Sequence, residues 1–228
     1  MNYKELIYID IETAGKYPDL ETLKANDIRG YELFLRKLDR KGVQFTDWKI
    51  DPNEVYLNKV SLIPEFGRIV CVSMAMIKDD KVQMISVCDE DEKFIIEKVH
   101  KILMNFSVKT LFSLSGYYIK GFDIPWLNRK MMEYGLQIPK ILQTFNVKPW
   151  EMSIVDLADV WKSNGTLESV SFDEMLYTLG IESPKSVIAG KDVHKCFWID
   201  KDLNKIKTYC EADVMSCVKA AKKISHLL

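Results

Sequence analysis

A short apolar run near the start of the chain carries an acidic residue, and a second acid follows it. Residues 6–11 read Leu-Ile-Tyr-Ile-Asp-Ile, and Glu12 comes directly after them. An apolar run of this length is typical of a β-strand buried in a sheet. Because side chains alternate between the two faces of a strand, Asp10 and Glu12 would share one face. Adjacent carboxylates repel and resist burial, so we expect either a divalent cation between them or Glu12 in solvent beyond the strand.

The rest of the sequence alternates strand and helix patterns. Strands are predicted at 68–77 and 82–88, joined by a hairpin turn, and at 110–114, and helices at 89–106, 124–135, 171–179 and 202–228. The polar stretch at about 15–58 is interpreted as an insertion, with a helical pattern at 20–41. An opening strand, a hairpin and then alternating helices and strands predict an α/β sheet of mixed direction. We expect one domain over residues 1–228, with a partly helical insertion.

Composition excludes several classes of protein. The 228 residues include 32 Lys and Arg against 33 Asp and Glu, a net charge of -1, so a globally basic surface for nucleic acid is excluded but a local basic track is not. No apolar run approaches the ~18 residues that span a bilayer, and the first residues lack the apolar core of a signal peptide. The 5 cysteines form no CxxC pair. These features predict reduced thiols in a cytoplasmic protein without a membrane partner.

The last predicted helix carries an acid on its packing face. An apolar stripe at steps of three and four residues is interrupted once, by Asp213. The stripe consists of Ile206, Cys210, Asp213, Cys217, Ala220 and Ile224. Tyr209 lies four residues before Asp213, so its phenol and the carboxylate can point into one space. The alternative is a core tyrosine, with Asp213 at the edge of the stripe and bonded to a lysine or a backbone N–H.

Another acid, Asp123, immediately precedes an apolar helix whose second residue is Pro125. Taken alone, Asp123 is interpreted as an ordinary N-cap. Together with Asp10, Glu12 and Asp213, it makes four carboxylates on separate elements that an α/β sheet can bring to one edge. Four negative charges match two divalent cations, and hard oxygen ligands suit Mg²⁺ or Mn²⁺. Two such ions ~3.5–4 Å apart stabilise both the attacking and the leaving oxygen of a phosphoryl displacement.

Three short motifs contain these acids: Asp10-Ile11-Glu12, Phe122-Asp123 and Tyr209-Cys-Glu-Ala-Asp213. In this order they resemble the three motifs of the DEDD (DnaQ-like) 3′–5′ exonucleases, with a third motif of the Tyr-x-x-x-Asp type. Four further stretches are similar to the predicted exonucleases related to the proofreading domain of family B DNA polymerases: 64–73, 119–127, 148–151 and 192–194. The motifs occur in order at suitable separations, and this combination is far more specific than any one of them.

The resemblance implies a ribonuclease H-like fold, a five-stranded mixed β-sheet flanked by α-helices. It implies that Asp10, Glu12, Asp123 and Asp213 hold two divalent cations, Mg²⁺ or Mn²⁺. Tyr209 would orient the attacking water, which one metal helps to deprotonate, and a nucleoside 5′-monophosphate would be released. The expected substrate is the 3′ end of single-stranded or frayed DNA, in nucleic-acid processing or repair. The alternatives are an exonuclease for RNA or short oligonucleotides, and a degenerate nucleic-acid-binding module without activity; no polymerase or repair partner is identified.

Five residues are candidates for substrate binding: Ile11, Thr13, Tyr118, Lys120 and Phe122. Thr13 follows the acid of the first motif, where members of the family contact the terminal nucleotide. Tyr118 departs from the family, since residues 116–123 read Gly-Tyr-Tyr-Ile-Lys-Gly-Phe-Asp where the family has Gly-His-Asn-Ile-Lys-Gly-Phe-Asp. The donors and acceptor of an amide are thereby lost. The phenol either stacks on a terminal base or obstructs the site.

Several other residues near the motifs have less specific interpretations. The lysines close to them either contact phosphates or lie on a solvated surface: Lys120, Lys148, Lys185, Lys191 and Lys195. His194 is interpreted equally well as a structural, a gating or a catalytic histidine. Trp150 and Trp161 are predicted to lie in the core.

Overall fold

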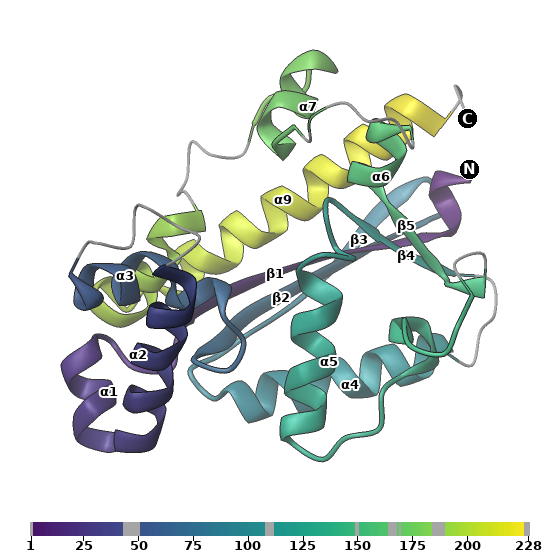
Figure 1. The fold of residues 1–228 in the computed structure, drawn as a ribbon. Helices are drawn as coiled ribbons and strands as arrows, with labels where there is room; N and C mark the ends of the chain where they lie inside the picture. Colours follow the sequence, from purple (N-terminus) through teal and green to yellow (C-terminus); the bar gives the residue numbers. More distant parts are fainter. Residues whose placement is uncertain are drawn as a thin grey trace.

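Five strands form one mixed sheet at the centre of the structure (Figure 1). This computed structural model describes residues 2–42, 51–107, 112–148, 151–163, 168, 170–183 and 190–225. The strands are β1 (Leu6–Gly15), β2 (Gly67–Lys78), β3 (Lys81–Cys88), β4 (Ser113–Gly116) and β5 (Ile154–Asp156). Their order is β3-β2-β1-β4-β5, with β1 antiparallel to β2, parallel to β4, and β4 parallel to β5. The predicted α/β architecture with a mixed sheet is therefore confirmed.

Helices cover both faces of the sheet (Figure 1). The α-helices are α1 (Leu20–Asn26), α2 (Ile28–Gly42), α3 (Pro52–Lys59), α4 (Glu92–Ser107), α5 (Asp123–Glu133), α6 (Leu157–Lys162), α7 (Phe172–Thr178), α8 (Val193–Lys195) and α9 (Leu203–Ile224). A π-helical turn spans Cys196–Asp200, and short 3₁₀ turns span Tyr3–Glu5, Val60–Leu62, Lys140–Leu142 and Gly190–Asp192. Ile7 and Ile9 of β1 belong to the core shared with α4 and α5, whereas Tyr8 belongs to the core shared with α9. Because successive side chains of β1 point to opposite faces of the sheet, the core has two layers, one on each face.

Strand β1 is longer than its apolar run predicts. It continues to Gly15, so Glu12 lies within the strand, and the interpretation of Glu12 as a solvated residue beyond the strand is wrong. Pairing with β4 covers only Leu6 to Tyr8. The edge of β1 that faces β4 is therefore open over the residues that carry the two acids. The register with β2 also shifts between Glu12 and Thr13, which marks a bulge at the same place.

The predicted insertion is helical and lies beyond the C-terminal end of β1 (Figure 1). The single helix expected at 20–41 is in fact two helices, α1 and α2. The break occurs at Asp27, whose N–H bonds the carbonyl of Leu23 at the end of α1 and whose Oδ1 accepts from the N–H of Gly30 in α2. The helices share a small apolar cluster around Phe34, whose ring meets those of Tyr56 and Phe66 edge-on. The insertion therefore has a core of its own.

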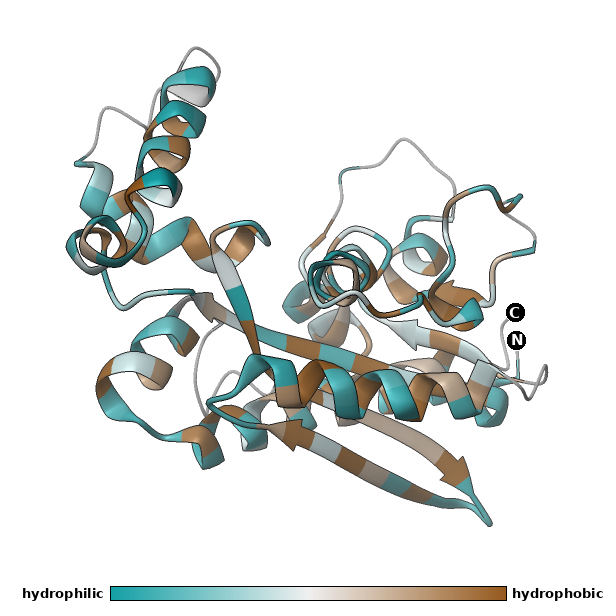
Figure 2. Ribbon diagram, turned by 90° about the horizontal axis from the view of Figure 1, so that it is seen from below, coloured by the Kyte–Doolittle hydropathy of each residue, from teal (hydrophilic) through white to brown (hydrophobic). Residues whose placement is uncertain are grey.

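The remaining sequence predictions differ from the structure mainly in where the helices and strands begin and end. The hairpin turn between β2 and β3 places Asp79 and Asp80 at positive φ, as a tight two-residue turn requires. Figure 2 shows hydrophilic and hydrophobic residues alternating along β3, the outer strand of this hairpin, which is exposed on one face. The strand expected at 110–114 begins only at Ser113, and residues 108–111 lie outside the described part. β5 was not predicted, because three residues cannot display a period.

Other predictions concern single elements. The capping box at Ser171 and Glu174 is confirmed at the start of α7. Trp161 is partly buried and packs against the apolar core that α9 shares with Tyr8, whereas Trp150 lies outside the described residues. Among the helices that the structure describes, none has the length and apolarity needed to cross a bilayer.

Candidate active site

Three of the predicted acids meet at the open edge of β1. Asp10 and Glu12 come from the strand, and Asp123 is the first residue of α5. The N–H of Ile11 donates to Asp123 Oδ1 at 3.0 Å, so the helix start is bonded to the strand residue between the two acids. Glu12 is 7% exposed and Asp123 3% exposed. The interpretation of Asp123 as an N-cap is wrong, because Phe122 holds that position and the carboxylate bonds to β1 instead.

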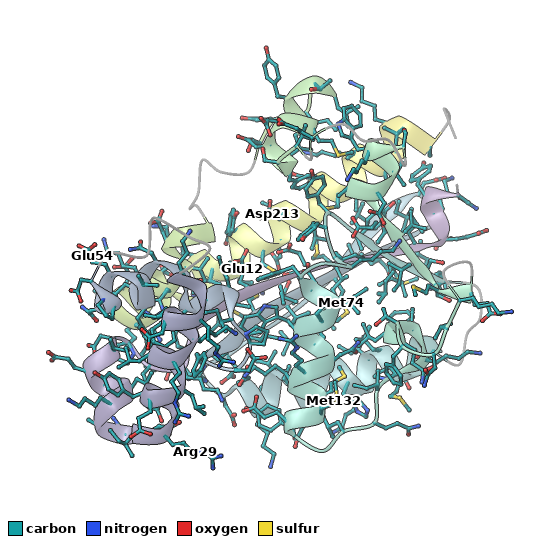
Figure 3. The ribbon with its side chains drawn as sticks, in the orientation of Figure 1. Glu12, Arg29, Glu54, Met74, Met132 and Asp213 are labelled. Carbon is teal, nitrogen blue, oxygen red and sulfur yellow. The ribbon has the colours of Figure 1, made fainter. Side chains whose placement is uncertain are left out.

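The fourth acid and the tyrosine come from α9. Tyr209 and Asp213 lie one turn apart and line, together with Asp10, a cavity of about 180 Å³. Other residues that line this cavity are Tyr117, Phe172, Asp173, Leu176, Ser183 and Cys217. Figure 3 labels Glu12 on β1 and Asp213 on the facing stretch of α9, beside the strand. All four acids and Tyr209 thus converge from β1, α5 and α9.

Burial and mutual repulsion dominate the electrostatics of this centre. Burial raises the pKa of Asp10 well above its usual range, and the charge of Glu12 raises it further. Burial likewise raises the pKa of Glu12, with Asp213 the strongest neighbouring charge. Burial raises the pKa of Asp123 to about 7, although hydrogen bonds from backbone N–H groups, including that of Ile11, oppose the shift. The three carboxylates therefore resist being charged together in the absence of a counter-ion.

The phenol of Tyr209 is also held in its neutral form. Burial raises the pKa of Tyr209 far above its usual value, and the charge of Asp213 and a hydrogen bond with it raise it further. A neutral phenol can donate one hydrogen bond and accept others. Its hydroxyl is therefore suited to orient a polar group in the cavity rather than to act as a base.

The donor set fits divalent cations. Ligand atoms of Asp10, Glu12 and Cys210 all lie within 4.8 Å of one another. Within the described part of the chain, no lysine, arginine or histidine forms an ion pair with Asp10, Glu12 or Asp123. Buried carboxylates without a cationic partner are costly unless a metal ion neutralises them. Carboxylate oxygens are the ligands that Mg²⁺ and Mn²⁺ prefer.

The sequence interpretation did not identify three residues of this neighbourhood. Cys210 lies on α9, and its Sγ is 3.4 Å from both the carbonyl oxygen and Oδ2 of Asp10. Tyr117 contributes to the wall of the acidic cavity, stacks on Phe172 and donates to the carbonyl of Val170. Cys210 could have been found within the third motif, since it shares the stripe of Asp213. Tyr117 stands where the family has a histidine, but its place in the wall of the cavity was not predicted.

The third unrecognised residue, Asp156, shapes the loop before α5. Its carboxylate accepts from the N–H groups of Tyr118 at 2.8 Å and Lys120 at 2.9 Å. It also caps α6 by accepting from Ala158. Because this loop leads directly into Asp123, Asp156 positions a metal-ligand candidate without lining the acidic cavity. An acid after the apolar pair 154–155 is a weak signal, which explains why it was overlooked.

Tyr118 does not contribute to the lining of the acidic cavity. It has a positive φ of 60°, and its side chain lies over Gly121, where a Cβ would overlap the ring. The residue is 59% exposed and lines a separate cavity of about 600 Å³ with Asp159 and Trp161. Tyr117 lines both cavities, so they adjoin at that residue.

The other substrate-binding candidates are engaged within the protein. Thr13 is buried, and its hydroxyl donates to the carbonyl of Ser61 at 2.6 Å. Lys120 Nζ pairs with Asp159 at 2.8 Å. Phe122 is half-buried against the core of α5, with Trp126 as its aromatic neighbour. Ile11 contacts the site through its backbone N–H, which donates a hydrogen bond to Asp123.

His194 connects the insertion to β1. Its Nδ1 accepts from the N–H of Gly15 at 2.9 Å, and its Nε2 lies 2.9 Å from the carbonyl of Pro18 and therefore donates. The ring is buried, and burial lowers the pKa of His194 below its usual value. Both nitrogens are thus committed to the backbone, which favours the structural interpretation. Of the other lysines near the motifs, Lys148 and Lys195 are exposed, and the side chains of Lys185 and Lys191 lie outside the described part.

Comparisons with known proteins concern the family and the fold of the chain. Residues 62–218 match a family described as "Predicted 3'-5' exonuclease related to the exonuclease domain of PolB". A comparison with curated proteins found no match. Among solved structures, the family B DNA polymerase from the hyperthermophilic archaeon Pyrobaculum calidifontis is similar with a TM-score of 0.58 and 14% identity. The alignment covers 96% of this chain and 24% of the polymerase, so the similarity concerns the fold of one part of that enzyme.

Proposed function

Because the chain belongs to the family of predicted 3′–5′ exonucleases related to the exonuclease domain of PolB, we propose that it hydrolyses the terminal phosphodiester of single-stranded or frayed DNA. The observation that carries the proposal is the convergence of four acids and Tyr209 on one edge of β1. Asp10, Glu12, Asp123 and Asp213 would hold two divalent cations, Mg²⁺ or Mn²⁺. When bound, these ions would supply positive charge to the attacking and leaving oxygens of the reaction.

The residues of the chain have distinct roles in this proposal. The neutral hydroxyl of Tyr209 orients the attacking water, since its raised pKa keeps the proton on the phenol. The bond from Ile11 fixes Asp123 against the strand that carries the other two acids. The oxygen of the water forms a bond to phosphorus and loses a proton to the solvent, and the bond from phosphorus to the 3′-oxygen of the preceding nucleotide breaks. That oxygen takes up a proton, so a nucleoside 5′-monophosphate and a strand one nucleotide shorter with a 3′-hydroxyl are released. These residues come from three elements, with α5 and α9 in the two different core layers that β1 separates.

The size of the acidic cavity favours a single strand. At about 180 Å³ it is smaller than a pocket for a whole drug-sized ligand, so a base pair does not fit inside it. Tyr118 supports the same preference, because an exposed ring beside the cavity offers a stacking surface for a base. Its absence from the cavity lining argues against obstruction of the acids. We therefore favour the stacking role for Tyr118, and Tyr118→Asn should weaken binding of single strands.

The test is nucleotide release from a 3′-labelled single-stranded DNA with Mg²⁺ or Mn²⁺. We expect metal-dependent release of 5′-monophosphates, and its loss in an Asp10→Asn/Glu12→Gln variant that retains the size of both side chains. An RNA of the same sequence decides between the two polymer substrates. If neither DNA nor RNA is degraded with either metal, the nuclease proposal fails and a binding module without activity replaces it.

A further inference from the structure

A groove between the insertion and α5 concentrates positive charge in a chain that is nearly neutral. The groove has a volume of about 470 Å³. Its cationic side chains are Lys16, Arg29, Lys37, Arg40 and Arg129, against the two acids Asp27 and Glu65. We call this the insertion groove. Its lining is therefore strongly basic, although the whole chain has a net charge of -1.

The two walls of the insertion groove are connected by surface ion pairs. Glu65 pairs with Lys37 of the insertion at 3.3 Å and with Arg129 of α5 at 2.7 Å. Lys16 pairs with Glu133 of α5 at 2.9 Å. These pairs are exposed and individually weak, so a stronger anion could replace the carboxylates. They nevertheless hold the two walls of the groove at a fixed separation before a ligand binds.

Two arginines provide positive charge that the groove itself does not neutralise. In the stretches of chain that the structure describes, no ion pair involves Arg29 or Arg40. Arg40 makes only a hydrogen bond from Nε to the carbonyl of Arg36, and both arginines are exposed. Guanidinium groups pair with phosphate in a bidentate geometry. The groove is therefore complementary to a phosphate-bearing polyanion.

The floor of the insertion groove is apolar. Leu23 and Phe66 are buried in the core of the insertion and contribute to the lining, and Leu33 is 38% exposed there. An apolar floor with a cationic rim suits a nucleotide unit, whose base is flat and apolar and whose phosphate is charged. A polypeptide made only of acidic residues would satisfy the rim but would leave the apolar floor without a matching group.

The insertion groove and the acidic centre share two structural elements. Lys16 follows the last residue of β1, four residues after Glu12, which is about 13 Å along an extended chain. Arg129 lies six residues after Asp123 on α5, about 9 Å along the helix. Figure 3 places Arg29 at the far end of the insertion from Glu12 and Asp213, so the groove leads away from the acids. Only a strand of several nucleotides could occupy both places.

We propose that the insertion groove binds the phosphodiester backbone of the substrate strand, several nucleotides before its 3′ end. This inference rests on the proposed function and specifies its substrate as a strand longer than a di- or trinucleotide. The insertion precedes residue 62 and lies outside the residues that match the family. Glu65, Phe66 and Arg129 of the same groove lie within the matched residues, so the groove is formed by both parts of the chain.

The test compares Arg29→Gln/Arg40→Gln with a control of equal charge change, Lys219→Gln/Lys222→Gln, on the exposed side of α9. Binding of a fluorescent dT20 is measured by anisotropy at several salt concentrations, with each pair of substitutions placed in an Asp123→Asn background to prevent hydrolysis. Each phosphate contact on a single strand contributes about 0.7 to the slope of log K against log salt. Loss of two contacts should therefore lower the slope by about 1.4 and weaken binding at 0.1 M salt by about tenfold or more.

Hydrolysis by the otherwise wild-type enzyme gives a second readout. The groove variant should degrade dT20 less efficiently at low substrate concentration but should hydrolyse dT3 as the wild type does, because a trinucleotide cannot reach the groove. Equal binding and equal salt slopes in the groove and control variants would overturn the inference while leaving the exonuclease intact. Poly-glutamate that binds as tightly as dT20, with the same loss in the groove variant, would overturn it in favour of an acidic polypeptide. If the wild type hydrolyses neither substrate, the proposed function fails, and the anisotropy result alone decides on the groove.

Discussion

The N–H of Ile11 donates to Asp123 Oδ1 at 3.0 Å, across 112 residues of sequence. This bond is available because pairing with β4 ends at Tyr8 and leaves the edge of β1 open. It fixes the start of α5 against the strand residue that lies between Asp10 and Glu12. One backbone hydrogen bond thus brings the second acidic motif to the first.

Two substitutions at Asp123 should distinguish the effect of its negative charge from the effect of its hydrogen bond with Ile11. Asp123→Asn retains the carbonyl oxygen that accepts from Ile11 but removes the negative charge, whereas Asp123→Ala removes both. We expect both variants to lose at least about a hundredfold in turnover. In the absence of metal, Asp123→Asn should be more stable to denaturant than the wild type, and Asp123→Ala about 1–3 kcal/mol less stable than Asp123→Asn. Equal unfolding free energies of the two variants would show that the bond contributes nothing to stability.

The raised pKa of Asp123 makes the stability of the metal-free protein depend on pH. Burial raises the pKa of Asp123 from 3.8 to about 7, so the folded state favours the protonated carboxyl. Its contribution to stability is therefore complete below about pH 4 and is lost as the pH rises through about 7. In EDTA, the gain in unfolding free energy from Asp123→Asn should be small near pH 4 and should increase to a plateau above about pH 8. Urea unfolding of the wild type and Asp123→Asn across this range measures the difference in unfolding free energy. A difference that is constant with pH would contradict a raised pKa of Asp123 in the folded state.

Removal of the Tyr209 hydroxyl should affect chemistry more than folding. Burial and the Asp213 carboxylate raise the pKa of Tyr209 far above neutrality, so the phenol stays protonated at any working pH. Tyr209→Phe should lower kcat by about ten- to a hundredfold, by the same factor at pH 6.5 and pH 9. Its Mn²⁺ affinity, measured by calorimetry, should remain close to that of the wild type. A loss of kcat that varied between these pH values would instead indicate a titrating tyrosine.

Three of the four acids could be singled out from the sequence because each interrupts a regular pattern, whereas Asp123 alone is typical of an ordinary N-cap. Asp10 and Glu12 interrupt a buried strand, Asp213 interrupts an apolar stripe, and the motifs around them occur in a family order. The extension of β1 past Ile11 was not predicted, because the apolar run ends there while pairing with β2 continues to Gly15. The end of a strand depends on its partner, and the partner is not visible in a local pattern.

Side-chain directions in the loop before α5 were beyond the reach of sequence patterns. The positive φ of Tyr118 is stabilised by Asp156, which lies 38 residues later in the chain. The hydroxyl of Thr13 is likewise directed by Ser61 of the insertion region, 48 residues away. Both residues were expected to contact substrate because of their motif positions. A contact made across the fold decides the orientation of each side chain, and no spacing within one segment predicts it.

The buried His194 should stabilise the junction between β1 and the insertion in a pH-dependent way. Burial lowers the pKa of His194, so the folded state favours the neutral ring that accepts from Gly15 and donates to Pro18. This contribution is present above about pH 6.5 and is lost as the pH falls through the lowered pKa. His194→Ala should reduce the free energy of unfolding at pH 8 by about 2–4 kcal/mol, because one buried and one partly buried hydrogen bond and the packing of the ring are lost.

The pH dependence and a matched variant distinguish this role from simple packing. The destabilisation by His194→Ala should decrease between pH 7 and pH 5, whereas that of a purely apolar cavity would not change with pH. Tyr56 packs edge-on against the ring and donates its own hydroxyl to Tyr17, so Tyr56→Phe is the control that perturbs the same junction without a titrating group. Urea unfolding of the three proteins at pH 5 and pH 8 measures both effects. Equal destabilisation by His194→Ala at the two pH values would show that the neutral imidazole is not what fastens the insertion to β1.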